Sequence, residues 1–300
     1  MALTLVEAAK LSNDVLVQGV IETIVKDDPL LEILPWIPVV GNALTYNQEN
    51  AASGAAWYDP NETWLEQTPT FTQLTANLRI AGGDADIDNF IKRTRSNVND
   101  LEADMIMLKA KAVREEIRNS LINGNNSTNP KQPDGLPRLI PAGQEVFCNG
   151  AVAGNGATLT MNALDRLIDQ VRGPVDIFLM SRRSRRKLTG LFRASGSGVL
   201  PIEKTSFGNF VMMYNTVPVA TSDYIGDAET VGASVDCSTI YAIQFGEGAF
   251  AGITASPSVI EVERVGNLET KDATRTRVKS YVAWALFNSI RCAKLTGVRD

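Results

Sequence analysis

The sequence of 300 residues contains no histidine. Without an imidazole, the chain cannot build a Ser-His-Asp or Cys-His nucleophile system. It also lacks the side chain whose ordinary pKa suits acid–base catalysis near neutral pH, and the commonest protein ligand of zinc, copper and haem iron. We therefore expect no enzyme of these classes, no catalytic residue, no bound cofactor and no metal site.

Cysteine is scarce as well, with three residues at Cys148, Cys237 and Cys292. Their number is odd, they lie far apart, and none forms a Cys-x-x-Cys pair. This pattern argues against a disulfide framework. It favours three buried thiols in a protein that folds in a reducing, intracellular environment.

Long hydrophobic runs are missing. The uncharged segment 146–164 contains several glycines and asparagines, whereas a bilayer span needs about 20 mostly apolar residues. The first residues, MALTLVEAAKLSND, lack the basic region that begins a signal peptide. We expect no contact with a membrane.

Positive charge is in slight deficit, with 29 basic against 34 acidic residues and a net charge of −5. This balance argues against a general nucleic-acid coat. The one strongly basic segment is a predicted helix that Ser181 caps, within a stretch from 177 to 202 that has no acidic residue. Its positive face could meet a nucleic-acid backbone or an acidic patch on a neighbouring subunit, or it could be a solvated face paired locally. The basic residues concerned are Arg182, Arg183, Arg185, Arg186 and Lys187.

Three aspartates alternate over 84–88, as at the start of a calcium-binding loop. The rest of such a loop is absent, because Asn89 stands where glycine is needed and Arg95 where glutamate is needed. The pattern instead predicts the acidic start of a short helix over 84–92, after a turn at Gly82-Gly83.

The clearest periodic element is 97–122, where apolar residues first recur at intervals of three and four. This spacing predicts an amphipathic helix of about seven turns, about 39 Å long. Asn123-Gly124 should end it. The apolar register drifts in the second half, which argues against a coiled coil.

Two predicted strands, 39–48 and 70–80, flank about 20 residues that show neither a helical nor a strand period. So long an irregular segment is unusual inside a compact domain. It carries the large aromatic side chains Trp57, Tyr58 and Trp64. They are either anchors for a partner surface or side chains that pack back onto their own domain.

The remainder mixes helices and strands. Thr160 should cap a helix to about Arg172, a buried strand should follow over 175–180, and the basic helix comes next. Further strands are predicted at 138–140, 145–148, 210–214, 217–221, 239–245 and 259–265, with one or two more over 275–295. The chain is thus expected to be of the α+β class, with a central sheet in its second half.

The order of these segments resembles that of the major capsid proteins of tailed bacteriophages, which have the Hong Kong 97-like capsid fold. The resemblance covers nearly the whole chain and includes the segments LTLVEAAKLS, GNALTYNQEN and RCAKLTGV and the turn Asp134-Gly135-Leu136. It implies an N-terminal arm at 1–38, an extended loop at 39–80, a peripheral domain at 81–157 that includes the spine helix 97–122, an axial domain at 158–256, and return peripheral strands with a closing strand at 257–300.

The resemblance implies a structural protein that assembles with itself into hexamers and pentamers. These would form an icosahedral shell around double-stranded DNA, touched without sequence specificity. The subunit would assemble in the host cytoplasm and reside in the virion, with scaffolding, portal and decoration proteins as further partners. Two alternatives stay open: an encapsulin-type compartment that shares this fold but encloses enzymes, and a soluble enzyme or binding domain whose segment 49–68 closes over a pocket.

Some members of this capsid family link their subunits through an isopeptide bond from a lysine in the extended loop. This chain has no lysine between Lys26 and Lys92. A bond of that type from this loop is therefore excluded, and the resemblance implies a shell held together by non-covalent contacts.

Overall fold

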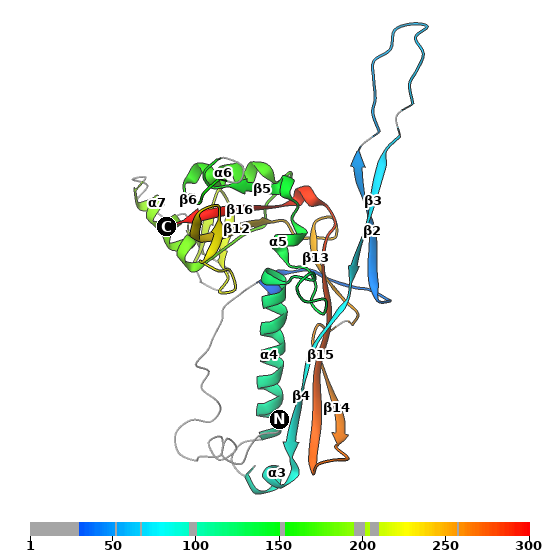
Figure 1. Ribbon diagram of the computed structural model, residues 1–300, viewed down its shortest axis with the longest axis vertical. Helices are drawn as coiled ribbons and strands as arrows, with labels where there is room; N and C mark the ends of the chain where they lie inside the picture. The colour runs from blue at the N-terminus through cyan, green and yellow to red at the C-terminus, as the bar shows by residue number, and fades with distance from the viewer. Residues whose placement is uncertain are drawn as a thin grey trace.

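The computed structural model describes residues 30–51, 53–66, 68–95, 101–150, 154–194, 202–204, 210–256 and 258–300. Most of the predicted N-terminal arm lies outside these residues. The molecule is elongated and has three parts (Figure 1). A lobe built on a nine-stranded sheet lies beside one end of a long helix and its five-stranded sheet, and a narrow two-stranded ribbon projects beyond both.

The five-stranded sheet is organised around β15, which pairs antiparallel with β13, β14 and β4. The short strand β1 extends the sheet by pairing in parallel with β13. The strands are β1 (Trp36–Pro38), β4 (Arg79–Asp88), β13 (Phe250–Thr254), β14 (Glu261–Asn267) and β15 (Ala273–Leu286).

The long helix α4 (Leu101–Asn123) packs along β4 and β15, as Figure 1 shows. Its second half buries Val113, Ile117 and Leu121, which recur at intervals of four. The helix predicted over 97–122 is confirmed from Leu101 onward. It ends as expected, because Gly124 N donates to Ser120 O at 2.9 Å just past the last helical residue.

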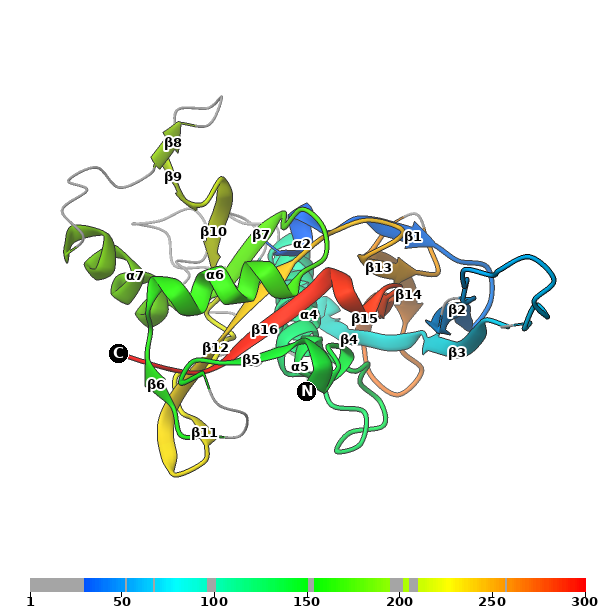
Figure 2. The same ribbon diagram turned by 90° about the horizontal axis from the view of Figure 1, so that it is seen from above.

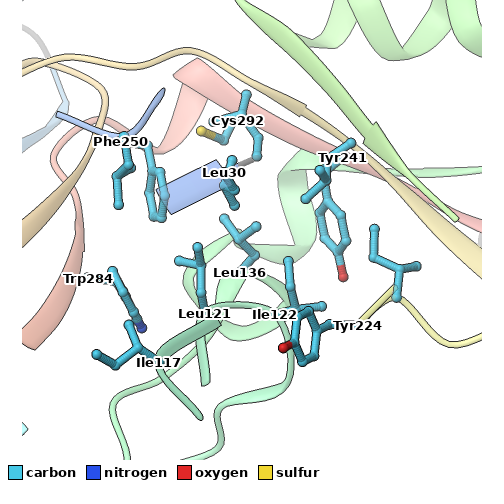
Figure 3. Close-up of a cluster of buried hydrophobic side chains, with 14 of the residues drawn as sticks. Leu30, Ile117, Leu121, Ile122, Leu136, Tyr224, Tyr241, Phe250, Trp284 and Cys292 are labelled. Carbon is cyan, nitrogen blue, oxygen red and sulfur yellow. The ribbon is translucent and has the colours of Figure 1, made fainter. Parts of the chain in front are cut away.

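The C-terminal end of α4 packs into a hydrophobic cluster to which several neighbouring elements contribute side chains (Figure 3). Side chains from α4 meet the short helices α2 (Leu30–Ile33) and α5 (Leu136–Leu139) and both sheets. Full burial of such side chains is the main favourable contribution to folding, at about 25 cal/mol per Å² of apolar surface. The central members drawn in Figure 3 are Leu30, Ile117, Leu121, Ile122, Leu136, Phe250 and Trp284.

The face of the five-stranded sheet away from α4 is charged. Along β15, Thr274, Thr276 and Val278 are buried, so the intervening side chains point to the opposite face. There Arg277 Nε donates to Asp84 Oδ1 at 2.7 Å, and Arg275 Nε donates to Asp86 Oδ1 at 2.6 Å. Acidic and basic side chains thus alternate across neighbouring strands.

This arrangement corrects the expected turn at Gly82-Gly83 and the helix from Asp84, because both segments lie within β4. A Cβ atom on Gly82 would stand 2.7 Å from Val278 O, so glycine there permits close approach of β15. Helix α3 (Asn89–Arg95) begins later, and Asp88 Oδ1 accepts from Phe90 N at 2.8 Å at its start.

The second sheet has nine strands, and its central strand β7 is buried on both faces. Along the main path its order is β5-β16-β12-β7-β10-β9-β8, with β6 beside β16 and β11 beside β12. The strands are β5 (Glu145–Phe147), β6 (Ala157–Thr158), β7 (Ile177–Met180), β8 (Ile202–Lys204), β9 (Phe210–Tyr214), β10 (Val217–Thr221), β11 (Glu229–Val231), β12 (Ser234–Ile243) and β16 (Cys292–Arg299).

Helices α6 (Met161–Gln170) and α7 (Arg182–Ala194) cover one face of this sheet through a second hydrophobic cluster. Both predicted N-caps are confirmed. Ala163 N donates to Thr160 Oγ1 at 3.2 Å, and Ser184 N donates to Ser181 Oγ at 3.2 Å.

The strand predicted at 138–140 is wrong. Leu136–Leu139 forms the short helix α5, with proline in its first turn and a fully buried Leu136. Two single turns of 3₁₀ helix, Ala142–Gln144 and Ser289–Arg291, connect strands. With both sheets and their helices in place, the α+β class is confirmed. Within the described residues, no helix is long and apolar enough to cross a membrane.

The charged face of the five-stranded sheet predicts a specific acid sensitivity. Hydrogen bonds from Arg277 and Arg275 hold the pKa values of Asp84 and Asp86 below the ordinary 3.8. Their contribution to stability is therefore present above that value and is lost as the pH falls through the lower folded-state pKa values. The double variant Asp84→Asn/Asp86→Asn should melt at a lower temperature at pH 7 and lose less further stability between pH 6 and pH 2.

Melting curves recorded at several pH values test this expectation. Glu247→Gln, which removes an exposed carboxylate outside this sheet, serves as the control and should keep the wild-type pH dependence. A double variant whose melting temperature falls with acid as steeply as that of the wild type would contradict the assignment.

Candidate functional site

The ribbon is formed by β2 (Ala43–Ala51) and β3 (Thr70–Asn77), which pair antiparallel. Its base is bound to the end of β15. Tyr46 Oη donates to Leu286 O at 3.1 Å, and Gln48 Nε2 donates to Leu286 O and Phe287 O at 3.0 and 2.8 Å. The rings of Tyr46 and Phe287 meet edge to face at 4.9 Å, and burial raises the pKa of the Tyr46 hydroxyl. These contacts fix the direction in which the ribbon leaves the body.

The opposite face of the ribbon is polar. The hydroxyls of Thr45 and Thr75 lie 3.4 Å apart, and Gln73 Nε2 donates to Asn47 Oδ1 at 3.4 Å. The ribbon extends past the rest of the molecule (Figure 1). A two-stranded ribbon alone is marginally stable in water, so its outer part depends on other contacts.

At the tip, the aromatic side chains organise one another. Tyr58 and Trp64 stack with ring centroids 4.6 Å apart and an angle of 13°. Tyr58 Oη donates to Leu65 O and accepts from Leu65 N, at 3.3 and 3.2 Å. The tight turn between them closes through Glu62 N, which donates to Asp59 O at 3.1 Å. The tip therefore has a defined shape.

The tip nevertheless leaves large apolar side chains in solvent. Trp57 is fully exposed and Trp64 is 78% exposed, so these residues do not pack back onto their own domain. Leu65 and Phe71 are also exposed, and neither was among the contact residues predicted from the sequence. Phe71 lies opposite Glu49 on the polar face of the ribbon, which the strand period of 70–80 could have indicated.

The basic helix predicted from Ser181 is α7, and three of its arginines are bound to carboxylates of the same chain. Arg182 Nε donates to Asp223 Oδ1 at 2.5 Å, Arg183 Nε lies 3.4 Å from Asp227 Oδ1, and Arg186 is hydrogen-bonded to Asp300. Arg183 Nη2 also donates to Asp236 O at 2.7 Å. For these three residues the local pairing considered from the sequence is what the structure shows.

Arg185 is an exposed residue of α7. Together with Arg186 and Arg193 it lines an open groove with a volume of about 640 Å³. The opposite side of the groove is formed by β9 and β10 through Val211, Met212 and Val219. Lys187 is half-buried on α7 and does not line this groove. We call this feature the arginine groove.

The remaining candidates for chemistry are weak. The three cysteine thiols are free and buried, and burial raises the pKa of Cys148 to about 11 and that of Cys292 to about 12. Such thiols are poor nucleophiles. Among the residues that the structure describes, no group of three His, Cys, Asp or Glu side chains could hold a metal ion. The segment 53–66 projects away from the body (Figure 1).

A comparison with solved structures finds the same fold along nearly the whole chain. The holo-SrpI encapsulin complex from Synechococcus elongatus PCC 7942 matches with a TM-score of 0.75 and 19% identity over 99% of this chain and 96% of that chain. The capsid of a native GTA particle matches with a TM-score of 0.67 and 15% identity, over 96% and 95% of the two chains. The capsid of Myoviridae phage XM1 matches with a TM-score of 0.62 and 15% identity, over 95% and 97%.

No protein-family model and no curated protein sequence matches the chain. At identities of 19% and below, the structural matches show a common fold and no more.

Proposed function

We propose that this chain, which has the Hong Kong 97-like fold seen in phage capsids and an encapsulin, is the subunit of a closed protein shell. The observation that carries the proposal is the ribbon. Its base is fixed on β15 by Tyr46 and Gln48, while its tip exposes Trp57, Trp64 and Leu65. An arm that is anchored at its base, projects from a folded body and ends in exposed apolar side chains is suited to contact another copy.

Within this proposal, Trp57, Tyr58 and Trp64 are inter-subunit contacts. The ring of Tyr58 stacks on that of Trp64, and the side chain of Trp57 is fully exposed and so can be covered by a neighbouring subunit. Tryptophan and tyrosine are enriched among the residues that dominate interface energies. Covering these rings on a neighbouring subunit would remove from water an apolar area that their own chain leaves open.

The two sheets then correspond to the two domains of a shell subunit. We assign the nine-stranded sheet with α6 and α7 to the axial domain, and the five-stranded sheet with the spine helix α4 to the peripheral domain. In this assignment the closing strand β16 belongs to the axial domain, because it pairs with β12. Likewise β13 belongs to the peripheral domain, because it pairs with β15.

At a finer level, we propose that the chain is the major capsid protein of a tailed bacteriophage. Hexamers and pentamers would build an icosahedral shell around double-stranded DNA, with scaffolding, portal and decoration proteins as further partners. The support is the ordered set of segments along the sequence, together with full-length matches to a phage capsid and a GTA capsid.

The second candidate is an encapsulin-type compartment. The observation in its favour is the match to the holo-SrpI encapsulin complex, whose TM-score of 0.75 exceeds those of the two capsids at 0.67 and 0.62. The two candidates share the subunit geometry and differ in what the shell encloses.

Negative-stain electron microscopy and light scattering of the protein isolated from its native source test both levels of the proposal. Closed shells, or rings of five or six subunits, are expected. Nuclease-protected double-stranded DNA inside the particles would identify a capsid, and an enclosed protein without DNA would identify a compartment. A monodisperse monomer across concentration and salt, with its ribbon intact, would contradict a shell of either kind.

The ribbon tip gives a second expectation. Trp57→Ala should weaken assembly, by on the order of 2 kcal/mol per contact, and leave the melting temperature of the unassembled subunit unchanged, because Trp57 touches no core. Val40→Ala, which trims an exposed apolar side chain near the base of the ribbon, is the control. Equal losses of assembly and of subunit stability in Trp57→Ala would assign this residue to the fold of its own chain.

A further inference from the structure

We propose that the arginine groove on α7 is one side of a head-to-tail contact between copies of this chain. The other side is the α6–β5 edge of the next copy, which brings Asp169 to Arg185 and Arg193. This inference rests on the proposed function and names the surfaces by which neighbouring axial domains meet.

The arginines of α7 fall into two groups, those paired with a carboxylate of their own chain and those exposed without one among the described residues. Arg182, Arg183 and Arg186 are each paired with a carboxylate of their own chain. For Arg185 and Arg193, by contrast, the described part of the chain offers no such carboxylate, and both are exposed. They are eight residues apart and therefore on one side of the helix, about 12 Å apart along its axis. Two open guanidinium groups at this spacing form a stripe that favours carboxylate partners.

The side of the groove opposite the arginines is apolar. Val211, Met212 and Val219 form an apolar surface that faces the arginine stripe. An apolar surface bordered by charges is typical of a protein interface, in which a buried centre is surrounded by a polar rim. A nucleic-acid backbone would leave that surface uncovered, and none of the described residues that line the groove carries an aromatic ring on which a base could stack.

The arginine groove and β5 lie toward opposite ends of the nine-stranded sheet. The groove lies at the β9–β8 end of the strand order, and β5 lies at the other end. Figure 2 shows β8 and β9 on one side of this lobe and β5 on the other. A ring of identical subunits requires contacts between two different surfaces of each copy. Because the groove and the β5 edge lie on opposite sides of the lobe, one copy can contact the next through these two surfaces.

The β5 edge carries acidic side chains. A second groove of about 310 Å³ lies there between β5 and α6, lined by residues that include Glu145, Arg166 and Asp169. Glu145 is paired with Lys294 at 3.4 Å, and Arg166 Nη2 donates to Phe147 O at 3.4 Å.

Nearby on α6, Asp165 accepts from Tyr214 Oη at 2.5 Å and is occupied within its own chain. Asp169 is exposed, and its side chain has no hydrogen bond or ion pair within the described residues. It is therefore the carboxylate that this edge can offer to an arginine of the next copy.

Charge-reversal variants test the contact. Arg185→Glu and Arg193→Glu should each lower the assembled fraction by at least tenfold, and so should Asp169→Arg. Combining Asp169→Arg with both arginine variants should restore assembly, because every copy then presents the two surfaces with their charges exchanged. Lys131→Glu, an equal change of charge on an exposed loop, is the matched control and should assemble as the wild type does.

Assembly is read by native mass spectrometry and electron microscopy, and the melting temperature of each unassembled variant shows that it is folded. Unchanged assembly of the arginine variants would overturn the contact, and so would a loss of assembly that Asp169→Arg does not rescue. Normal assembly with reduced binding of double-stranded DNA would instead assign the groove to nucleic acid. A wild-type chain that forms no ring or shell would contradict the proposed function itself.

Discussion

Strand β15 is the element on which the other parts of the molecule depend. It pairs with β13, β14 and β4, and it supports the spine helix α4 on one face. Its last carbonyls, at Leu286 and the following Phe287, hold the base of the ribbon. A single turn of 3₁₀ helix then leads into β16 and the second sheet. Because one continuous strand carries all these contacts, the directions of the ribbon, the spine helix and the nine-stranded lobe are fixed relative to one another.

In this fold, the apolar and charged side chains of the body are mostly buried or paired within the chain, whereas some surfaces at the periphery stay exposed. The two large hydrophobic clusters lie where α4, α6 and α7 cover the sheets, and the outer face of the five-stranded sheet neutralises its own charges across neighbouring strands. Two of the surfaces without cover within the described chain are the aromatic tip of the ribbon and the arginine groove. They lie at different ends of the molecule (Figures 1 and 2). Contacts spread to the periphery in this way suit a subunit whose neighbours complete it.

The sequence predicted what local pattern controls, including the spine helix, the buried strand β7 and the caps Thr160 and Ser181. It failed where partners are distant along the chain. Gly82 suggested a turn, but it allows β15 to approach closely, and the alternating aspartates pair with arginines almost two hundred positions away. The carboxylates that occupy most of the arginines of α7 are likewise remote in sequence. At the ribbon tip, the aromatic residues could be identified from composition, but their stacking and exposure required the fold.

Hydrogen exchange of the backbone amides, compared between dilute unassembled subunits and assembled particles, tests the central claim most directly. The ribbon base is covered within its own chain, whereas the tip would be covered only by a neighbouring subunit. Amides of the paired strands near Tyr46 should therefore be protected in both states. Amides over 57–66 should exchange rapidly in the free subunit and slow at least tenfold on assembly. Equal exchange of the tip in the two states would show that no neighbour covers it, and would contradict the account.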